Sequence, residues 1–196
     1  MVTLKLANEQ VQKLKKRANQ DRQISTTLET SRPYTRYEVL TAHIWRCSTK
    51  ARKHQREQPT ACAITIDSRK RLQSPLPFSY FGNGVFYIMA SCTSGDLLSK
   101  SLGFGASKVR LAIESTNGGG KYYGNPNVGV INWMNLPFEG IDFGWGKEIH
   151  FGPAYHKVDG DLWILRSGDE DESLLIVICL LVEHVKAFKK YFFDDI

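Results

Sequence analysis

Apolar and polar residues alternate along the chain with two distinct periods. A period of two, as at Val2, Leu4 and Leu6, is typical of a strand that buries one face. Similar alternation, and short apolar runs bounded by turn residues, recur further along the chain. Together these patterns predict strands over residues 2–6, 61–67, 85–92, 128–136 and 174–182.

Apolar residues three or four positions apart predict helices between these strands. Thr35 is followed three residues later by Glu38, which is the signature of a capping box at a helix start. Gly103 and Gly105 weaken a later helix, because glycine is a poor helix former. The predicted helices cover residues 8–19, 35–53, 96–114 and 183–193.

Polar and turn-forming residues separate these elements. Residues 20–36 show no period and are predicted to form a linker, and residues 140–152 are rich in turns. Strands and helices mix without a strict repeat, so we expect the α/β (mixed α+β) class, with a mixed β-sheet and flanking helices. A strand, a helix and the linker over residues 1–36 would then precede a single domain over residues 37–196.

The composition is that of a soluble globular protein. Of the 196 residues, 42% are hydrophobic and 23% are charged, and no apolar run is long enough to cross a bilayer. The first residues contain no apolar signal segment, so we expect a cytoplasmic protein that does not associate with membranes. The cysteines lack metal-site spacing, so we expect no metal and reduced thiols at Cys47, Cys62, Cys92 and Cys179.

The formal charge of +6 is distributed unevenly. Residues 1–71 contain 16 lysines and arginines against 6 acidic residues, whereas the remaining chain contains 10 against 14. A basic half is typical of proteins that bind nucleic acid, an acidic membrane or a phosphate-bearing cofactor; a solvated cationic surface is the alternative. No recognised nucleic-acid-binding module accompanies the basic residues, so we do not expect nucleic acid as a partner.

The most specific signal in the chain is the run Asp142-Phe143-Gly144-Trp145-Gly146. It resembles the DFGWG motif of the BAHD acyltransferases, which move acyl groups from coenzyme A thioesters to hydroxyls or amines. Further segments resemble the helix that opens the family's second half, its D-x-R-x-R turn, its YFGN loop, its acceptor-pocket strand and its last helix. These segments are residues 37–47, residues 67–71, the loop Tyr80, Phe81, Gly82 and Asn83, residues 125–133 and residues 186–193.

The resemblance covers nearly the whole chain and implies the fold of a truncated family member. It corresponds to the carboxy-terminal half of a chloramphenicol-acetyltransferase-like fold. It implies a coenzyme A thioester as co-substrate, with no covalently bound cofactor, and an amine or alcohol as acceptor. Between Glu114 and Tyr122 the chain is short, whereas the family carries a longer helical insert that forms part of the acceptor-pocket wall.

The resemblance also implies roles for individual residues. In the family the DFGWG segment fixes loops beside the coenzyme A channel, and its aspartate, here Asp142, pairs with the arginine of the turn, here Arg69. Phe143 and Trp145 are expected to pack. The residues expected to line the acceptor pocket are Trp133, Gly124 and Asn132, although Trp133 fits an ordinary core tryptophan equally well. Candidates for binding the phosphates of coenzyme A are Lys50, Arg52 and Arg71.

One position bears on the acceptor. The hydroxycinnamoyl transferases, especially the spermidine-type branch, show the strongest resemblance. Enzymes of this group that esterify shikimate or quinate place an arginine where this chain has Gly124, and that arginine clamps the acceptor carboxylate. An anionic acceptor would lose this charge-assisted partner, whereas a polyamine would lose a repulsive one. The alternative is that a tight turn before Pro126 needs glycine.

The catalytic base of the family is absent from these residues. Acyl transfer needs a base that takes the acceptor proton, and the family supplies it from an H-x-x-x-D motif in its other half. None of the five histidines is followed by aspartate four positions later, and His156 with Asp159 is one residue short. We therefore expect no catalytic residue here and negligible turnover without a complementary amino-terminal half. The alternative is a non-catalytic protein whose exposed former domain face binds a partner.

Overall fold

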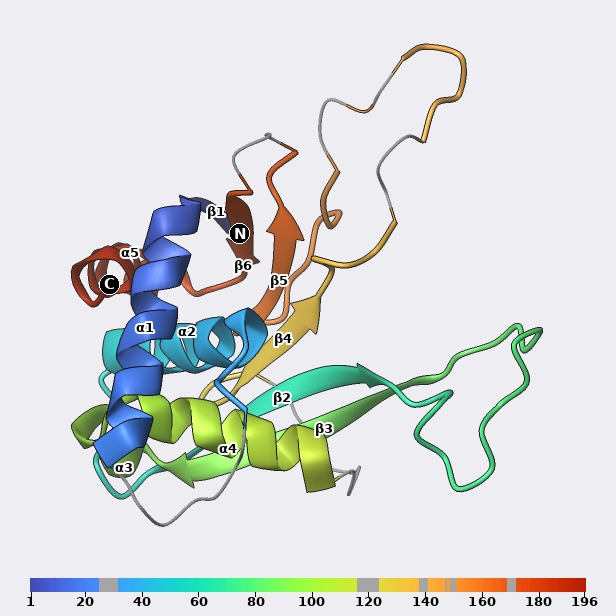
Figure 1. Cartoon of the computed structure of the whole chain (residues 1–196). Coiled ribbons are helices and arrows are strands. Elements are labelled where there is room, and N and C mark those ends of the chain that lie inside the picture. The colour runs from blue at the N-terminus through green and yellow to red at the C-terminus, as the bar shows by residue number, and fades with distance from the viewer. Residues whose placement is uncertain (25–31, 116–123, 138–140, 147, 149–150, 169–171) are drawn as a thin grey trace.

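The structure is a computed structural model that describes residues 1–24, 32–115, 124–137, 141–146, 148, 151–168 and 172–196. Helices and strands alternate along the chain without a strict repeat (Figure 1). In chain order the elements are β1 (Val2–Leu6), α1 (Asn8–Ile24), α2 (Arg36–Ala51), β2 (Pro59–Asp67), β3 (Val85–Thr93), α3 (Ser94–Ser99), α4 (Leu102–Ser115), β4 (Val128–Asn132), β5 (Asp161–Arg166), β6 (Leu174–Ile178) and α5 (Val182–Asp194).

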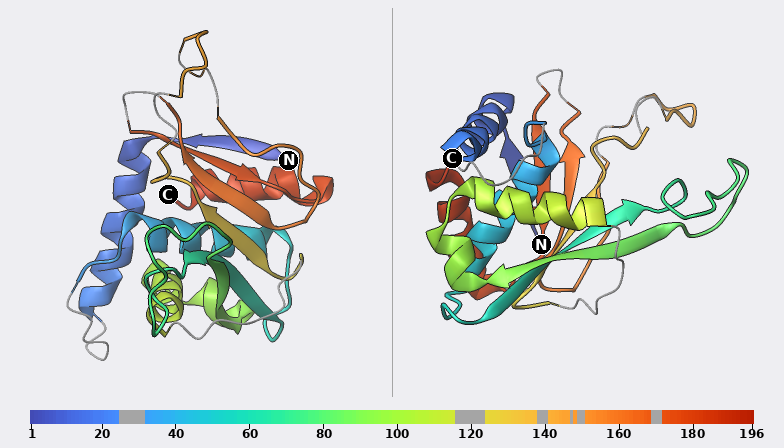
Figure 2. Two further views of the ribbon diagram at one scale, coloured as in Figure 1. Left: turned by 90° about the vertical axis from the view of Figure 1, so that its right-hand side faces the viewer. Right: turned by 60° about the horizontal axis from the view of Figure 1, so that its bottom comes forward.

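The strands form one mixed sheet in the order β1-β6-β5-β4-β2-β3. β2, β4 and β5 run parallel to one another, whereas β1 with β6, β6 with β5, and β2 with β3 are antiparallel. The long helices α1, α2, α4 and α5 lie on one face of the sheet (Figures 1 and 2). The expected mixed sheet with flanking helices is therefore confirmed.

The main core lies between this sheet face and α2. The side chains of Leu40, Ile44 and Trp45 on α2 are fully buried, and they pack in one cluster with Ile64 of β2 and Val130 of β4. Each buried large apolar side chain stabilises the fold by about 1.5–3 kcal/mol. The same cluster includes side chains of β1 and α1, so the first 20 residues belong to the same core as the rest. A domain boundary at residue 36 stays a prediction.

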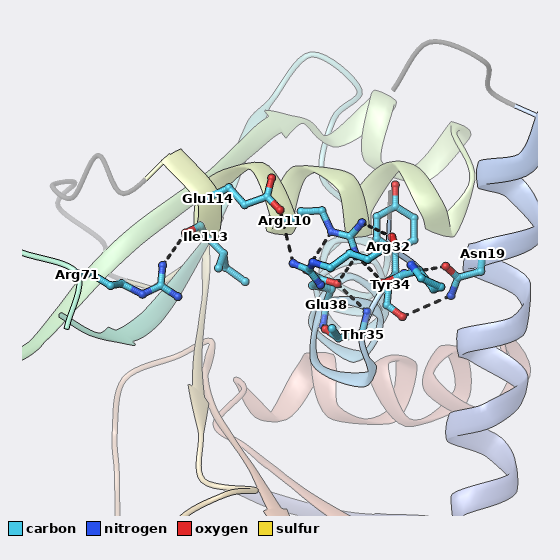
Figure 3. Close-up of polar contacts among 10 residues, drawn as sticks. Asn19, Arg32, Tyr34, Thr35, Glu38, Arg71, Arg110, Ile113 and Glu114 are labelled. Atoms are coloured by element: carbon cyan, nitrogen blue, oxygen red, sulfur yellow. Dashed lines mark hydrogen bonds and ion pairs between the residues drawn. The ribbon is translucent and has the colours of Figure 1, made fainter. Parts of the chain in front are cut away.

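A buried arginine fastens the start of α2 to α4 and to the segment that precedes α2 (Figure 3). Arg110 of α4 donates to both carboxylate oxygens of Glu38 and to the backbone carbonyls of Arg32 and Pro33. Its guanidinium also lies 4.4 Å from the ring centroid of Tyr34. The predicted capping box at Thr35 is confirmed, because the Thr35 hydroxyl accepts from the Glu38 amide and the Glu38 carboxylate accepts from the Thr35 amide.

Several boundaries differ from those predicted. The first helix continues to Ile24, so the predicted linker begins later than residue 20. The helix predicted over residues 96–114 is two helices, because the chain is not helical at Lys100 and Ser101. Part of the turn-rich segment 140–152 and the shortened connection over residues 116–123 lie outside the described residues.

One strand was not predicted at all. β5 lies between β4 and β6, and its central residues from Leu162 to Leu165 are all buried. A strand covered on both sides is apolar without alternation, so a run this short carries no period to detect. On the face away from the helices, Trp163 and Leu165 form a second, smaller cluster with Val177 and Cys179.

Candidate functional site

The family motifs lie on two long loops that leave neighbouring parallel strands. The first arm, residues 68–84, follows β2, and the second arm, whose described residues are 133–137, 141–146 and 148, follows β4. Because β2 and β4 pair in parallel, their carboxyl ends lie at the same edge of the sheet. Both arms project beyond the sheet on the same side (Figure 1). The crevice outside the carboxyl ends of parallel strands is the usual ligand site of open α/β sheets.

Arg69 organises the first arm. Its guanidinium donates to the Asp67 carboxylate at 3.0 Å and to the Gly82 carbonyl at 2.8 Å. A Cβ added at Gly84 would lie only 2.7 Å from the Arg69 side chain, so glycine is needed for this close approach. The pKa of Asp67 is lowered first by the hydrogen bond from the Arg69 amide and further by the Arg69 guanidinium.

The rest of the first arm is also held by local contacts. The Ser68 hydroxyl donates to the Gly84 carbonyl at 2.7 Å, and the Asn83 side chain accepts from the Val85 amide at 3.0 Å. Arg71 donates from Nη1 to the backbone carbonyl of Ile113 at 2.8 Å, which joins the arm to the end of α4 (Figure 3). The two ends of the first arm are therefore joined to each other, and its beginning is also joined to α4.

The aspartate of the DFGWG segment shapes the tip of the second arm. Asp142 Oδ1 accepts hydrogen bonds from the backbone amides of Gly144 at 2.7 Å and Gly146 at 3.0 Å. Both glycines have φ of 96°, a conformation that side chains disfavour, so the motif requires glycine at these positions. Phe143 and Trp145 are 82% and 94% exposed, so no residue that the structure describes covers them, and a packing role for them stays a prediction.

The expected ion pair between Asp142 and Arg69 is not formed. Both residues are described, and each finds its partners nearby: Arg69 binds Asp67 at the end of β2 and Gly82 of its own arm, and Asp142 binds backbone amides of its own arm. The two loops project separately from the sheet (Figures 1 and 2). Short-range partners therefore occupy both side chains in this structure.

The three residues expected at the acceptor pocket lie at two ends of β4. Asn132 and Trp133 lie at its carboxyl end, where the Trp133 ring centroid is 5.6 Å from that of Phe151 and 6.4 Å from that of Trp163. Gly124 precedes the strand at its amino end. The structure does not bring Gly124 to Trp133, because an extended strand separates them.

The backbone explains the glycine at this position. Gly124 has φ of 57°, and its carbonyl accepts from the Asn127 amide across the turn that contains the cis peptide bond before Pro126. A Cβ at Gly124 would meet the Asp159 carbonyl oxygen at 3.5 Å, an ordinary contact. The conformation, rather than lack of space, therefore favours glycine here.

The three basic residues expected to bind coenzyme A do not lie together. Lys50 pairs with Asp195 at 3.0 Å, and Arg52, whose side chain is fully buried, pairs with Asp159 at 2.7 Å. Both follow or end α2, whereas Arg71 lies beyond the opposite end of β2 on the first arm. Carboxylates therefore pair with both Lys50 and Arg52, because the fold brings acidic residues of distant segments to them.

A histidine–carboxylate pair was not found by sequence reasoning. His156 Nε2 lies 2.6 Å from Asp161 Oδ2, and its ring packs edge-on against Trp163 with centroids 5.0 Å apart. In the sequence, Asp159 is the aspartate that follows His156 at nearly the motif spacing, but in the structure Asp159 pairs with Arg52. Recognising β5 would have revealed the partner, since Asp161 begins that strand.

The described residues contain neither a metal-like cluster nor a membrane-spanning element. Within them, no three His, Cys, Asp or Glu side chains gather closely enough to hold a metal ion. No helix among them combines the length and the apolar character that crossing a membrane requires.

Comparison with known proteins places the chain in one family. The family model described as Transferase family matches residues 1–195. The hydroxycinnamoyl-CoA:piscidic acid hydroxycinnamoyltransferase of Actaea racemosa is 36% identical, over 98% of this chain and 49% of its own length. The shikimate O-hydroxycinnamoyltransferase of Nicotiana tabacum is 32% identical, over 97% of this chain and 47% of its own length.

A third relative transfers the same type of acyl group to nitrogen. The hydroxycinnamoyl-CoA:5-hydroxyanthranilate N-hydroxycinnamoyltransferase HHT4 of Avena sativa is 32% identical, over 82% of this chain and 41% of its own length. The alignment with the Actaea racemosa relative spans 224 positions, more than the 196 residues of this chain. That relative therefore carries residues with no counterpart here.

Solved structures share the fold at low sequence identity. F. sporotrichioides TRI101, in complex with coenzyme A and T-2, superposes with a TM-score of 0.78 over 95% of this chain and 47% of its own, at 17% identity. Vinorine synthase superposes with a TM-score of 0.75 over 94% of this chain and 45% of its own, at 15% identity. The chain spans about half the length of the relatives that it matches. It belongs to the transferase family of the BAHD acyltransferases, with hydroxycinnamoyltransferases among its relatives, and corresponds to their carboxy-terminal half.

Proposed function

We propose that this chain supplies the half of a coenzyme A-dependent hydroxycinnamoyltransferase that shapes the coenzyme A channel. The observation that carries the proposal is the placement of the D-x-R-x-R and DFGWG segments on two ordered arms at one edge of the sheet. In this role the arms position substrate and exclude water. The arms themselves need no acid or base.

The proton transfer belongs to residues outside this chain. Acyl transfer to a hydroxyl or amine needs a base that takes the acceptor proton and a donor for the developing oxyanion. None of the five histidines has aspartate four positions later. His43 is buried against the Phe192 carbonyl, and His156 pairs with Asp161 outside any H-x-x-x-D motif. We therefore propose that the 196-residue chain alone shows negligible turnover.

We propose that the cations of the first arm steer the phosphates of coenzyme A. Lys50, Arg52 and Arg69 each pair with a carboxylate of this chain, whereas Arg71 donates to a backbone carbonyl, which supports Arg71 over the other three. Arg71 uses Nη1 to contact Ile113, and its fork geometry supplies further N–H groups that match a phosphate.

For the acceptor, we propose an amine such as spermidine in preference to shikimate, in the cytoplasm. The absence of an arginine at Gly124 supports this choice, because a carboxylate acceptor would lack its cationic partner there. The names of the relatives specify acids as acceptors: piscidic acid, shikimate and 5-hydroxyanthranilate. Amine and acid acceptors therefore need to be tested side by side.

A direct assay tests the proposal. The chain is incubated with coumaroyl- or caffeoyl-coenzyme A and either spermidine or shikimate, alone and with the amino-terminal half of the Actaea racemosa relative. We expect no product from the chain alone, product with the added half, and more product from spermidine. Asp142→Ala, which removes the acceptor of the two glycine amides, is expected to lower the reconstituted turnover. Turnover by the chain alone would refute the assignment of the base to the other half.

A non-catalytic role in binding a protein partner is the second candidate. The near-complete exposure of Phe143 and Trp145 favours it. Titration calorimetry with free coenzyme A separates the two candidates. Saturable heat with the wild type that is lost in Arg71→Ala supports the channel role. The absence of binding heat with both the wild type and the variant favours a role in partner binding alone.

A further inference from the structure

The first arm contains an exposed serine that is followed directly by proline. Ser74 precedes Pro75, and no other serine or threonine of the sequence precedes a proline. Both residues are exposed and lie outside helices and strands, on the loop that projects from the sheet after β2 (Figure 1). The Ser68 hydroxyl of the same arm donates to the Gly84 carbonyl, whereas the Ser74 hydroxyl forms no hydrogen bond with the part of the chain that the structure describes. The Ser74 hydroxyl is therefore accessible to an enzyme that modifies it.

The proline restricts the backbone at this serine. Proline fixes its own φ, and its ring disfavours the helical conformation of the residue before it. Ser74 is therefore kept out of a helix, and an exposed, non-helical serine followed by proline is what the proline-directed protein kinases accept as substrate.

Basic residues lie just before the serine. Positions 69–71 are Arg-Lys-Arg, and residues 68–84 contain no acidic residue. The Leu76 amide donates to the Arg69 carbonyl at 2.9 Å, which closes the backbone between these two residues into a loop. Because Ser74 lies inside this loop, its side chain is kept near the basic run. A negative charge at Ser74 would therefore meet cations of its own loop.

We propose that Ser74 is a phosphorylation site for a proline-directed protein kinase and that its phosphate masks the cations of the first arm. In the reaction Ser74 Oγ bonds to the γ-phosphorus of ATP while the bond from that phosphorus to the bridging oxygen of the leaving ADP breaks. The hydroxyl proton passes to the carboxylate base of the kinase. The product carries a charge of about −1.5 to −2 and three strong acceptor oxygens.

The phosphate regulates the site proposed above. Arg71, the cation proposed to steer the phosphates of coenzyme A, uses Nη1 for the Ile113 carbonyl (Figure 3). A phosphoserine three residues away competes for its remaining N–H groups at high effective concentration, because the two residues share one short loop. The charge of residues 68–84 also falls from +3 to about +1. This inference rests on the proposed function, because it names the regulation of the same cations.

The first test locates the phosphate. The chain is incubated with ATP and a purified kinase of the mitogen-activated class, and its peptides are analysed by mass spectrometry. We expect phosphate on Ser74, its loss in Ser74→Ala, and no change in Ser79→Ala. Ser79 is the matched control, because it is an exposed serine of the same arm that is followed by Tyr80 rather than proline. Phosphate on Ser79 instead of Ser74, or on neither, would overturn the proposed site.

The second test measures the masking. Titration calorimetry with free coenzyme A compares the unmodified and the phosphorylated chain. We expect phosphorylation to weaken binding by about tenfold or more, and Ser74→Ala treated with the same kinase to stay within about twofold of the unmodified chain. Equal affinity before and after phosphorylation would overturn the masking.

Phosphorus NMR provides a readout that does not depend on coenzyme A. The second pKa of phosphoserine is ordinarily about 6. Pairing with Arg71 favours the dianion, so we expect this pKa to be lower in the phosphorylated wild type than in phosphorylated Arg71→Ala by about 0.3 or more. The same pKa in both proteins would contradict the pairing. A lowered pKa together with no binding of coenzyme A by the unmodified chain would overturn the proposed function alone.

Discussion

Arg110 and Glu38 form a two-pronged ion pair between α4 and α2, with Nε–Oε1 3.1 Å and Nη2–Oε2 2.8 Å. Both side chains are 2% exposed. Burial alone raises the pKa of Glu38, but the hydrogen bonds from Arg110 and Thr35 outweigh it, and the pKa lies below its ordinary value. Arg110 also holds the segment before α2, because it donates to the backbone carbonyls of Arg32 and Pro33 (Figure 3).

Removing one member of this pair leaves the other charge buried. We expect Arg110→Leu to lower the free energy of unfolding by about 3–5 kcal/mol, measured by urea denaturation. Arg71→Ala, which removes a partly exposed arginine with one backbone contact, is the control and is expected to cost about 1 kcal/mol or less. Equal losses in the two variants would show that the buried pair contributes no more than a surface arginine.

His43 makes stability depend on pH. Burial lowers the pKa of His43 to about 4, although its hydrogen bond to the Phe192 carbonyl acts in the opposite direction. The unfolded chain then binds more protons than the folded one between pH 6.5 and 4, so the free energy of unfolding rises with pH in this window. The expected loss from pH 7 to pH 4 is on the order of 3 kcal/mol.

Urea denaturation of the wild type and His43→Gln across this pH range tests the assignment. Glutamine does not titrate and retains a donor for the Phe192 carbonyl. Glu38, whose pKa lies below 4.5, contributes to the pH dependence of the free energy of unfolding only at the acidic end of the window. We expect the variant to lose most of the slope between pH 6.5 and 5; an unchanged slope would assign it to other groups.

Gly124 is expected to be required by the backbone. With φ at 57°, Gly124→Arg places a side chain in the left-handed region and should destabilise the fold by about 1–2 kcal/mol in thermal or urea unfolding. Gly124→Asn is the matched comparison, because asparagine tolerates this region better. A stable arginine variant would contradict the backbone explanation and favour selection against positive charge.

We expect most of the fluorescence emitted by solvent-exposed tryptophan to come from Trp145. Trp45 and Trp163 are buried, Trp133 is half-buried, and Trp145 is 94% exposed. Trp145→Phe is therefore expected to shift the emission maximum to shorter wavelength and to reduce quenching by acrylamide. Trp133→Phe serves as the control and should leave the strongly quenched component in place. If the two variants behave alike, Trp145 is covered in solution.

Interactions between residues close together in the chain were predictable from the sequence, whereas interactions between distant residues were not. The capping box of Thr35 and Glu38 was predictable, because three residues of separation bring the two side chains together in any helix start. The strand that contains Trp163 was missed, because a short strand buried on both faces has no alternation. Because that strand was not predicted, the contact between His156 and Asp161 could not be predicted either.

The sequence by itself determined the mixed class, most helices and strands, and the motifs that identify the family, because these depend on residues close together in the chain. Only the tertiary structure decided that Arg52 binds Asp159, that Arg69 binds within its own arm, and that Gly124 and Trp133 stand at opposite ends of β4. The residue type, and with it the charge of a side chain, is known from the sequence. Its partner depends on which distant segments the sheet brings beside it.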